Sequence, residues 1–188
     1  RLWKKGFIDA IVTCPINKKS IELAGFRDFY GHTEFFANLV NCKRYLMLFY
    51  SDELKLALVT RHIALSEVSG HLTTDKIIDV IDIIHENAGL FNMEKDLKIA
   101  VCALNPHAGE VSFMGTEEDE IIIPAINKFK EKDILVEGPF SSDILFVKEN
   151  REKYDFIVSM YHDQGLIPFK MLAFDKGVNV TLGLPFIR

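Results

Sequence analysis

The sequence predicts an α/β fold built on a mixed, largely parallel sheet, and three observations support this. Short runs of apolar residues recur along the chain, each bounded by glycine, proline or polar residues, as buried strands are. Between them lie segments whose apolar residues recur at helical spacing, and this alternation is typical of layered α/β domains. The polar turn at residues 51–53 is too short for a parallel crossover, so a hairpin interrupts the parallel order.

The first predicted elements are short. Residues 8–13 are mostly apolar and predict a buried strand that ends before a proline. Residues 18–24 predict a helix that stops at Gly25, a candidate C-cap. A second helix is predicted over residues 34–40, with Thr33 as its candidate N-cap.

The central elements carry the strongest signals. Residues 44–50 and 54–60 predict the two strands of the hairpin. Thr73 begins an amphipathic helix whose apolar residues repeat at helical spacing and which ends at Gly89. Residues 97–104 predict the best buried strand of the chain, because a lysine is their only charged residue.

The C-terminal third repeats the alternation. Helices are predicted over residues 117–129 and from residue 142 onward. Residues 156–160 predict a buried strand that leads to His162, and residues 178–182 predict the last strand.

Composition excludes several classes of protein. With 48% hydrophobic and 26% charged residues, the 188-residue chain can form an ordinary globular core. Its net charge of −5 gives no general attraction for nucleic acid or for an anionic membrane. No apolar run reaches the length of a membrane span, and the first residues lack the apolar core of a signal peptide. We therefore expect a cytoplasmic protein with neither nucleic-acid nor membrane partners.

Cysteines and chain ends add two expectations. Cys14, Cys42 and Cys102 form no CxxC pair, which suits a reducing compartment with all three packed as small apolar residues. The chain has no initiator Met and ends directly after an apolar run. We expect residues 1–188 to be the central part of a longer, two-domain protein whose N- and C-terminal segments are missing.

Three histidines share one position in the predicted fold. His62, His107 and His162 each follow a strand-like run, at the edge where open α/β sheets bind ligands. Three imidazoles that converge there would form an open divalent-metal site with positions left for substrate. The pattern alone leaves the alternative open that they are three unrelated loop histidines.

Neighbouring residues indicate the kind of substrate. Lys170, Asn179 and Arg188 are donors suited to a phosphate or carboxylate, although each is also ordinary as an exposed Lys, a turn Asn and a terminal Arg. His32 and Thr33 at a helix N-terminus could add an anion contact.

Two carboxylates could serve the histidines. Asp163 and Asp143 are candidates to orient a ligand histidine, although Asp143 also fits as a first-turn helix acid. The chain has no GxGxxG after a strand, no P-loop and no nucleophile elbow. Residue patterns alone therefore indicate a metal-dependent enzyme that acts on a small anionic substrate, either by activating water or by stabilising an alkoxide or enolate.

Six short strings occur in a specific order. They are residues 13–18 (TCPINK), 31–34 (GHTE), 104–110 (LNPHAGE), 114–118 (MGTEE), 160–165 (MYHDQG) and 177–188 (GVNVTLGLPFIR). Together the strings resemble the 4-hydroxythreonine-4-phosphate dehydrogenase (PdxA) family of pyridoxal phosphate biosynthesis. The resemblance spans essentially the whole chain.

The resemblance implies a site, a fold and an assembly. It implies that His62, His107 and His162 bind a divalent metal (Zn²⁺, Mg²⁺ or Co²⁺). It implies that the substrate is contacted by His32, Thr33, Lys170, Asn179 and Arg188. The implied fold is similar to isocitrate and isopropylmalate dehydrogenases, a three-layer α/β/α arrangement that binds nicotinamide cofactor without a GxGxxG fingerprint. The implied assembly is a homodimer whose active site is shared between subunits.

The implied reaction oxidises a small phosphorylated amino acid. NAD or NADP would accept a hydride from 4-(phosphooxy)-L-threonine, giving 2-amino-3-oxo-4-(phosphooxy)butanoate, which decarboxylates to 3-amino-2-oxopropyl phosphate. Lys170 is the candidate catalytic residue, as base or as anion clamp. Alternatives are a related dehydrogenase that acts on another hydroxy acid or a dihydrodiol acid, and a metallohydrolase of a phosphorylated metabolite. Cys14 and Arg61 depart from what the family pattern leads us to expect.

Overall fold

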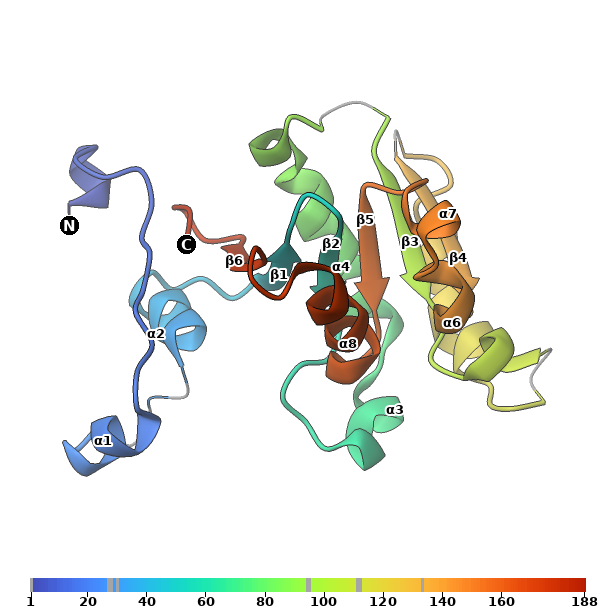
Figure 1. The fold of residues 1–188 in the computed structure, drawn as a ribbon, viewed down its shortest axis with the longest axis horizontal. Helices are drawn as coiled ribbons and strands as arrows, with labels where there is room; N and C mark the ends of the chain where they lie inside the picture. The colour runs from blue at the N-terminus through green and yellow to red at the C-terminus, as the bar shows by residue number, and fades with distance from the viewer. Residues whose placement is uncertain (1, 27–28, 30, 94–95, 111–112, 133) are drawn as a thin grey trace.

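The chain forms one six-stranded sheet with helices on both faces (Figure 1). The computed structural model describes residues 2–26, 29, 31–93, 96–110, 113–132 and 134–188. Its strands are β1 (Leu46–Tyr50), β2 (Lys55–Leu58), β3 (Lys98–Cys102), β4 (Leu135–Phe140), β5 (Phe156–Ser159) and β6 (Val178–Leu182). They lie in the order β4-β3-β5-β2-β1-β6, and β1 is antiparallel to both of its neighbours while the other neighbours pair in parallel. The predicted mixed, mostly parallel sheet is confirmed.

Eight α-helices are present in the described residues. They are α1 (Lys18–Leu23), α2 (His32–Leu39), α3 (Val68–His71), α4 (Thr74–Glu86), α5 (Ile123–Asn127), α6 (Ser142–Leu145), α7 (Lys148–Arg151) and α8 (His162–Ala173). A π-helical turn over Glu118–Ile122 leads into α5. Short 3-10 segments cover Trp3–Lys5, Leu65–Glu67, Ala88–Phe91 and the kinked Pro106–Glu110.

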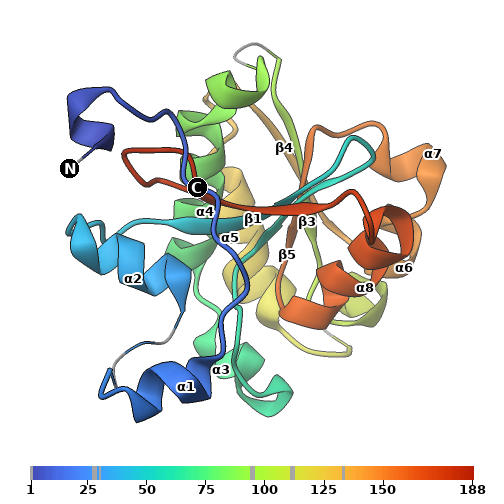
Figure 2. The same ribbon diagram turned by 60° about the vertical axis from the view of Figure 1, so that its left-hand side comes forward.

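The core lies on both faces of the sheet because strand side chains alternate. In β3, Ile99 and Val101 join a buried cluster with the apolar stripes of α4 and α5. Ala100 and Cys102 point the other way, into a cluster with α6 and α8. Figures 1 and 2 show α4 and α8 on opposite sides of the sheet. Each face is therefore closed by at least one helix.

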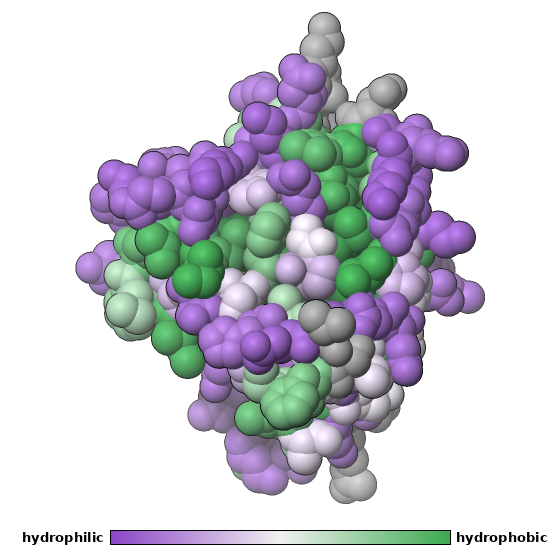
Figure 3. All heavy atoms as spheres, turned by 90° about the vertical axis from the view of Figure 1, so that its right-hand side faces the viewer, coloured by the Kyte–Doolittle hydropathy of each residue, from purple (hydrophilic) through white to green (hydrophobic). Residues whose placement is uncertain are grey.

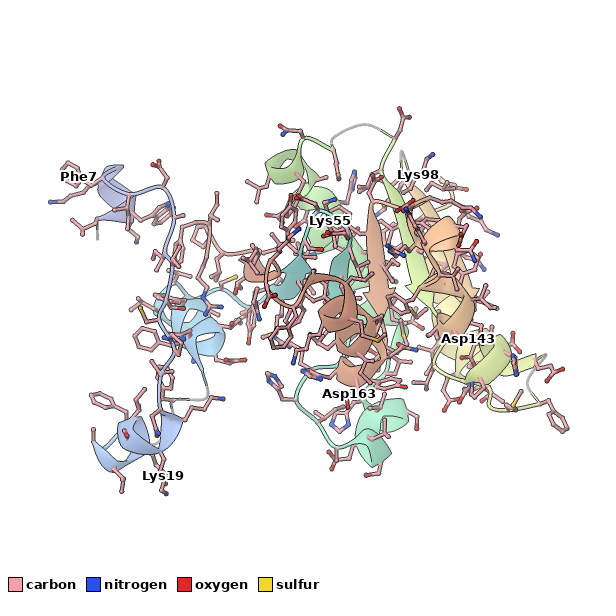
Figure 4. All side chains as sticks on the ribbon, viewed as in Figure 1. Phe7, Lys19, Lys55, Lys98, Asp143 and Asp163 are labelled. Atoms are coloured by element: carbon pink, nitrogen blue, oxygen red, sulfur yellow. The ribbon has the colours of Figure 1, made fainter. Side chains whose placement is uncertain are left out.

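The parallel strands bring their carboxyl ends to one edge. Figure 4 places Asp143 and Asp163 at this end of the molecule, whereas Lys55 and Lys98, the first residues of β2 and β3, lie at the other end. Loops that follow parallel strands therefore meet near the two aspartates, as expected for a ligand-binding edge.

Two predicted features of the N-terminal part are wrong. Residues 8–13 form no strand: Ala10 makes a single bridge to Ile187, and the Val12 side chain is 96% exposed. Figure 2 shows this segment running past the end of the chain, outside the sheet, so its apolar residues have no partner strand. Thr33 does not cap α2, because this helix begins at His32, two residues before the predicted start, with Gly31 as its N-cap. Its hydroxyl is used elsewhere.

Besides the one-turn helix α3, two elements were missed by sequence reasoning. Strand β4 contains Gly138 and Pro139, residues that normally argue against a strand. Proline is tolerated there because β4 is an edge strand. Figure 3 looks onto this side of the molecule, where apolar and hydrophilic side chains both reach the surface. The side chains of Leu135 in β4 and Ile144 in α6 are exposed. The second missed element, α8, has Gly165 and Pro168 inside it and a weak apolar stripe.

The remaining predicted elements are confirmed within a few residues. The hairpin is β1 and β2, and Thr73 caps α4 by accepting a hydrogen bond from the Lys76 N–H at 3.3 Å. The cysteines differ from expectation, because Cys14 is exposed while Cys102 is buried. Burial raises the pKa of the Cys102 thiol to about 11, so it stays protonated at neutral pH. No helix among the described residues is long and apolar enough to cross a membrane.

Candidate active site

Two of the three predicted histidines lie side by side. His62 follows β2, His162 begins α8 just after β5, and these two strands are parallel neighbours. The centroids of the two imidazole rings are 5.8 Å apart. The expected convergence at the carboxyl edge therefore holds for this pair.

Local packing fixes the position of His162. A Cβ atom at Gly165 would lie 2.6 Å from the Leu56 side chain, so glycine allows α8 to approach β2 closely. The Oδ1 atom of Asp163 lies 2.7 Å from His162 Nδ1. If the carboxylate accepts the proton of Nδ1, Nε2 keeps its lone pair for a ligand. The predicted contact of Asp163 with a site histidine is present.

A cavity of about 300 Å³ opens beside the pair. It is lined by Arg61, His62, Ile63, Leu65, Val68, Tyr161, His162 and Asp163. Most of the surface that these residues expose to the cavity belongs to apolar atoms, and the remainder comes from polar groups, as in small-molecule sites.

The pKa of His62 is lowered below its ordinary value. Partial burial is the largest cause, followed by the positive charges that His162 and Lys18 can carry. The Glu34 carboxylate acts in the opposite direction. A lowered pKa keeps His62 neutral at pH 7, the form in which imidazole can bind a metal ion or accept a proton.

We predict that His62 in metal-free full-length protein titrates with a midpoint below 6.5. NMR of the imidazole Cε1–H resonance against pH measures it, and His162→Gln should raise the midpoint because it removes a neighbouring positive charge. Because the pKa of His62 is lower in the folded protein, the unfolded chain binds this proton more tightly. The free energy of unfolding therefore falls as the pH drops below 6.5 and through the folded pKa of His62. A midpoint at or above 6.5 would contradict the prediction.

His107 occupies the same edge but stands apart from the pair. It follows β3 in the kinked segment Pro106–Glu110 and is exposed. In the part of the chain that the structure describes, no three His, Cys, Asp or Glu side chains come close enough to hold a metal ion. The donor chemistry of His62 and His162 suits a divalent ion, but a single copy of the described chain provides an incomplete ligand set.

The Arg188 guanidinium donates hydrogen bonds to three threonine hydroxyls. Its Nη1 atom donates to Thr33 at 3.1 Å and to Thr181 at 3.2 Å, and Nη2 donates to Thr13 at 3.1 Å. Burial lowers the pKa of the guanidinium, and Glu34 opposes this effect. No salt bridge to Arg188 occurs among the described residues. Its hydrogen bonds to described side chains go only to neutral hydroxyls, so its positive charge suits a bound anion.

Two predicted substrate residues, Asn179 and Lys170, lie on the same side of the sheet. Asn179 and Thr181 point to the same face of β6, because they are two residues apart. Val180 and Leu182 point to the opposite face, toward α4. The Asn179 side is the face covered by α8, which carries Lys170.

His32 and Lys170 are less tightly placed. His32 begins α2 and lies against Phe36, with ring centroids 6.5 Å apart. Lys170 is exposed in the last turn of α8 and makes no hydrogen bond or ion pair with another described residue. Lys170 lies eight positions after His162, which corresponds to about 12 Å along a helix. One copy of the described chain thus leaves Lys170 away from the histidine pair.

The Gln164 side chain connects three elements at the carboxyl edge of the sheet by hydrogen bonds. Its Oε1 accepts from the Met160 N–H at 2.7 Å, and its Nε2 donates to the Ala103 carbonyl at 2.6 Å and the Ser142 hydroxyl at 2.8 Å. These contacts join the ends of β3 and β5 to the start of α6.

Asp143 serves α6 rather than a histidine. Its Oδ1 atom accepts from the Ser141 hydroxyl and from the Ile144 N–H. The Ser141 hydrogen bond is the largest cause that lowers the pKa of Asp143, and the charge of His107 contributes less. The first-turn role therefore describes Asp143 better than contact with a ligand histidine.

Sequence reasoning gave no role to several residues of the site. Thr13, Thr181 and Gln164 all lie in the strings quoted above but were not assigned contacts. Thr181 could have been found, because it lies two residues from Asn179 in a predicted strand. Thr13 and Glu34 could not, because their neighbours are distant in sequence.

Known proteins resemble the chain over its full length. The family model described as "Pyridoxal phosphate biosynthetic protein PdxA" matches residues 1–188. A 4-hydroxythreonine-4-phosphate dehydrogenase of Desulforapulum autotrophicum is 48% identical over 183 residues, which cover 97% of this chain and 54% of that protein. The crystal structure of such a dehydrogenase from Klebsiella pneumoniae has a TM-score of 0.89 and 40% identity, covering 100% of this chain and 57% of that one.

A more distant structure shares only the fold. A terephthalate 1,2-cis-dihydrodiol dehydrogenase from Burkholderia xenovorans has a TM-score of 0.79 at 23% identity, covering 99% of this chain and 58% of that one. The chain spans about half the length of the curated relatives that it matches.

Proposed function

The chain belongs to the PdxA family of pyridoxal phosphate biosynthetic proteins, and on this premise we propose that the whole protein is a 4-hydroxythreonine-4-phosphate dehydrogenase. It oxidises 4-(phosphooxy)-L-threonine with NAD or NADP to 2-amino-3-oxo-4-(phosphooxy)butanoate. That β-keto acid loses CO₂ and gives 3-amino-2-oxopropyl phosphate. Relatives with this activity are 40–48% identical to the chain, whereas the dihydrodiol dehydrogenase is 23% identical, which favours the phosphorylated amino acid as substrate.

One observation carries the proposal: His62, one of the two neighbouring histidines, and the Arg188 guanidinium both lie near the Glu34 carboxylate. Glu34 influences the pKa of both His62 and Arg188. A substrate with a reacting hydroxyl at one end and a phosphate at the other matches this separation of roles. The phosphate would bind at Arg188, with hydroxyls of Thr33 and Thr181 as further donors.

The residues of the chain divide the work of the proposed reaction. Arg188 and its threonines orient the substrate through a group remote from the reacting carbon. Asp163 holds the His162 ring in one orientation. Lys170, as base or as anion clamp, and Asn179 with His32 complete the proposed substrate contacts. The hydroxyl proton leaves to a base while a hydride leaves to the nicotinamide, so the carbinol carbon is oxidised by two electrons.

A divalent ion is proposed at the histidines, with His62, His107 and His162 as ligands. Such an ion, Zn²⁺, Mg²⁺ or Co²⁺, would lower the pKa of the substrate hydroxyl. Because His107 stands apart from the other two in one copy, we propose that the site is shared in a homodimer. His107 of the partner subunit would then supply the third ligand.

The remaining assignments concern the whole protein. We propose that residues 1–188 are one largely complete domain and part of a second, in a fold like that of isocitrate and isopropylmalate dehydrogenases. Cofactor-binding residues would then lie largely outside this chain, in keeping with its coverage of about half of each relative.

Full-length protein with divalent metal, 4-(phosphooxy)-L-threonine and NAD or NADP tests the proposal. Reduced nicotinamide should appear in step with CO₂ release, and omission of the metal should stop both. A control with unphosphorylated 4-hydroxythreonine should react poorly, because it lacks the group that Arg188 binds. Release of inorganic phosphate without reduced nicotinamide would instead identify a metallohydrolase.

A further inference from the structure

We propose that Glu118 is a positioning residue that holds the His107 segment in shape for the proposed reaction, and this inference rests on the proposed function of His107. Glu118 is the one buried carboxylate among the described residues, with 3% of its surface exposed. It lies in the π-helical turn before α5, far from the substrate residues in sequence. Its burial is compensated by hydrogen bonds from N–H donors.

The Glu118 carboxylate binds the chain just before His107. Its Oε1 atom accepts hydrogen bonds from the backbone N–H groups of Leu104 and Asn105, both at 2.8 Å. Its Oε2 atom accepts from the Asn105 side-chain amide at 2.9 Å. The carboxylate therefore caps the end of β3, where the strand turns into the His107 segment.

The same carboxylate also touches the chain just after His107. A Cβ atom at Gly109 would lie 2.8 Å from Glu118 Oε2, so the backbone of Gly109 packs directly against it. Gly109 has a φ of 76°, so glycine suits this position both for its space and for its conformation. One side chain thus restrains both ends of the segment that presents His107.

The segment needs such restraint because its backbone is strained. His107, Ala108 and Glu110 have φ values of 52°, 54° and 41°, in the left-handed region that residues with a Cβ rarely adopt. Strained residues persist where surrounding contacts over-determine their conformation, and they are concentrated at functional sites. The hydrogen bonds of Glu118 are contacts of this kind.

The chemistry of these contacts calls for a carboxylate. Glu118 forms no ion pair with another described residue, so N–H donors alone accommodate its charge. An ionised carboxylate offers two acceptor oxygens, whereas a glutamine offers one and would place an NH₂ group against donors. Asn105 cannot simply turn its amide around, because its Nδ2 also donates to Glu117 at 2.8 Å.

The test compares full-length Glu118→Gln with Glu120→Gln, an exposed acid of the same turn. In metal-free protein, the NMR signal of the His107 imidazole should move or broaden in E118Q and stay in place in E120Q. Under catalytic conditions, E118Q should lower kcat and metal affinity by about 10- to 100-fold, as loss of a group that orients a ligand does. An unmoved His107 signal in folded E118Q would overturn the inference.

A double-mutant cycle separates this role from a general structural one. If Glu118 acts through His107, then H107A/E118Q should have the same kcat as H107A alone. An equal further loss of kcat from E118Q in the H107A background would show that Glu118 acts elsewhere and would overturn the inference. Two further results together would separate this inference from the proposed function. If the His107 signal moves in E118Q but H107A keeps the kcat of the wild type, then Glu118 positions His107, and the proposed role of His107 in the reaction fails.

Discussion

Replacing His162 by alanine is expected to lower kcat of the full-length enzyme by more than about 100-fold, the upper end of what loss of a mere orienting partner costs. His162 stands 5.8 Å from His62 between ring centroids, and alanine leaves one imidazole where there were two. Steady-state kinetics and elemental analysis of bound metal measure the effect. Asp163→Asn should have a smaller effect, because it keeps the ring and weakens only its orientation. Unchanged kcat and metal content in H162A would remove His162 from the site.

Subunit mixing tests the proposal that the site is shared between two subunits. When H107A and H162A subunits, each with only residual activity by itself, are mixed and allowed to exchange, about a quarter of wild-type activity should return, because half of the dimers are mixed and each has one intact site. Mixing H62A with H162A is the matched control. It should restore nothing, because these two histidines lie together in one copy. Equal failure of both mixtures would place all three histidines within one subunit.

Arg188→Ala should raise KM for the phosphorylated substrate by about 10- to 100-fold, the range expected for loss of hydrogen bonds to a charged group. A smaller change is expected in kcat, because the phosphate is remote from the reacting carbon. Arg188→Lys should be intermediate, since an ammonium cannot span the three threonines that the guanidinium contacts. Arg44→Ala is the control, because this exposed arginine pairs with Asp79 and Glu86 instead. An unchanged KM in R188A would make Arg188 a structural residue.

The elements with strong periodicity were predictable, and those governed by distant partners were not. The β1–β2 hairpin and α4 were readable because local pattern and burial agree there. Residues 8–13 have the composition of a strand but lack a partner in the sheet, which no local pattern reveals. Helix α8 was missed because Gly165, a weak helix former, is required by the close approach to Leu56. Tertiary packing overrode propensity in both cases.

The residue types of the candidate site, and its location at the carboxyl edge of the sheet, were predictable from the sequence. The distances between its residues were predictable only in part. Spacing after strands correctly placed His62 beside His162. The same rule placed His107 with them, yet its segment turns through left-handed residues that strand patterns do not anticipate. The partners of Arg188 were not readable because Thr13 lies 175 residues away in the chain. Contacts of that range depend on how the whole fold closes.

The sheet also sets a length scale for what can bind. Val180 of β6 is level with Ala57 of β2 across the intervening β1, since both pair with Leu48 in register. Thr181 follows Val180 directly in β6. Two strand spacings, about 10 Å, therefore separate the strand that leads to His62 from the strand that holds Arg188 in place. Backbone hydrogen bonds keep this interval from shrinking or stretching. A ligand that contacts both places would therefore have to bridge a distance set by the sheet, as well as carry groups of matching charge at its two ends.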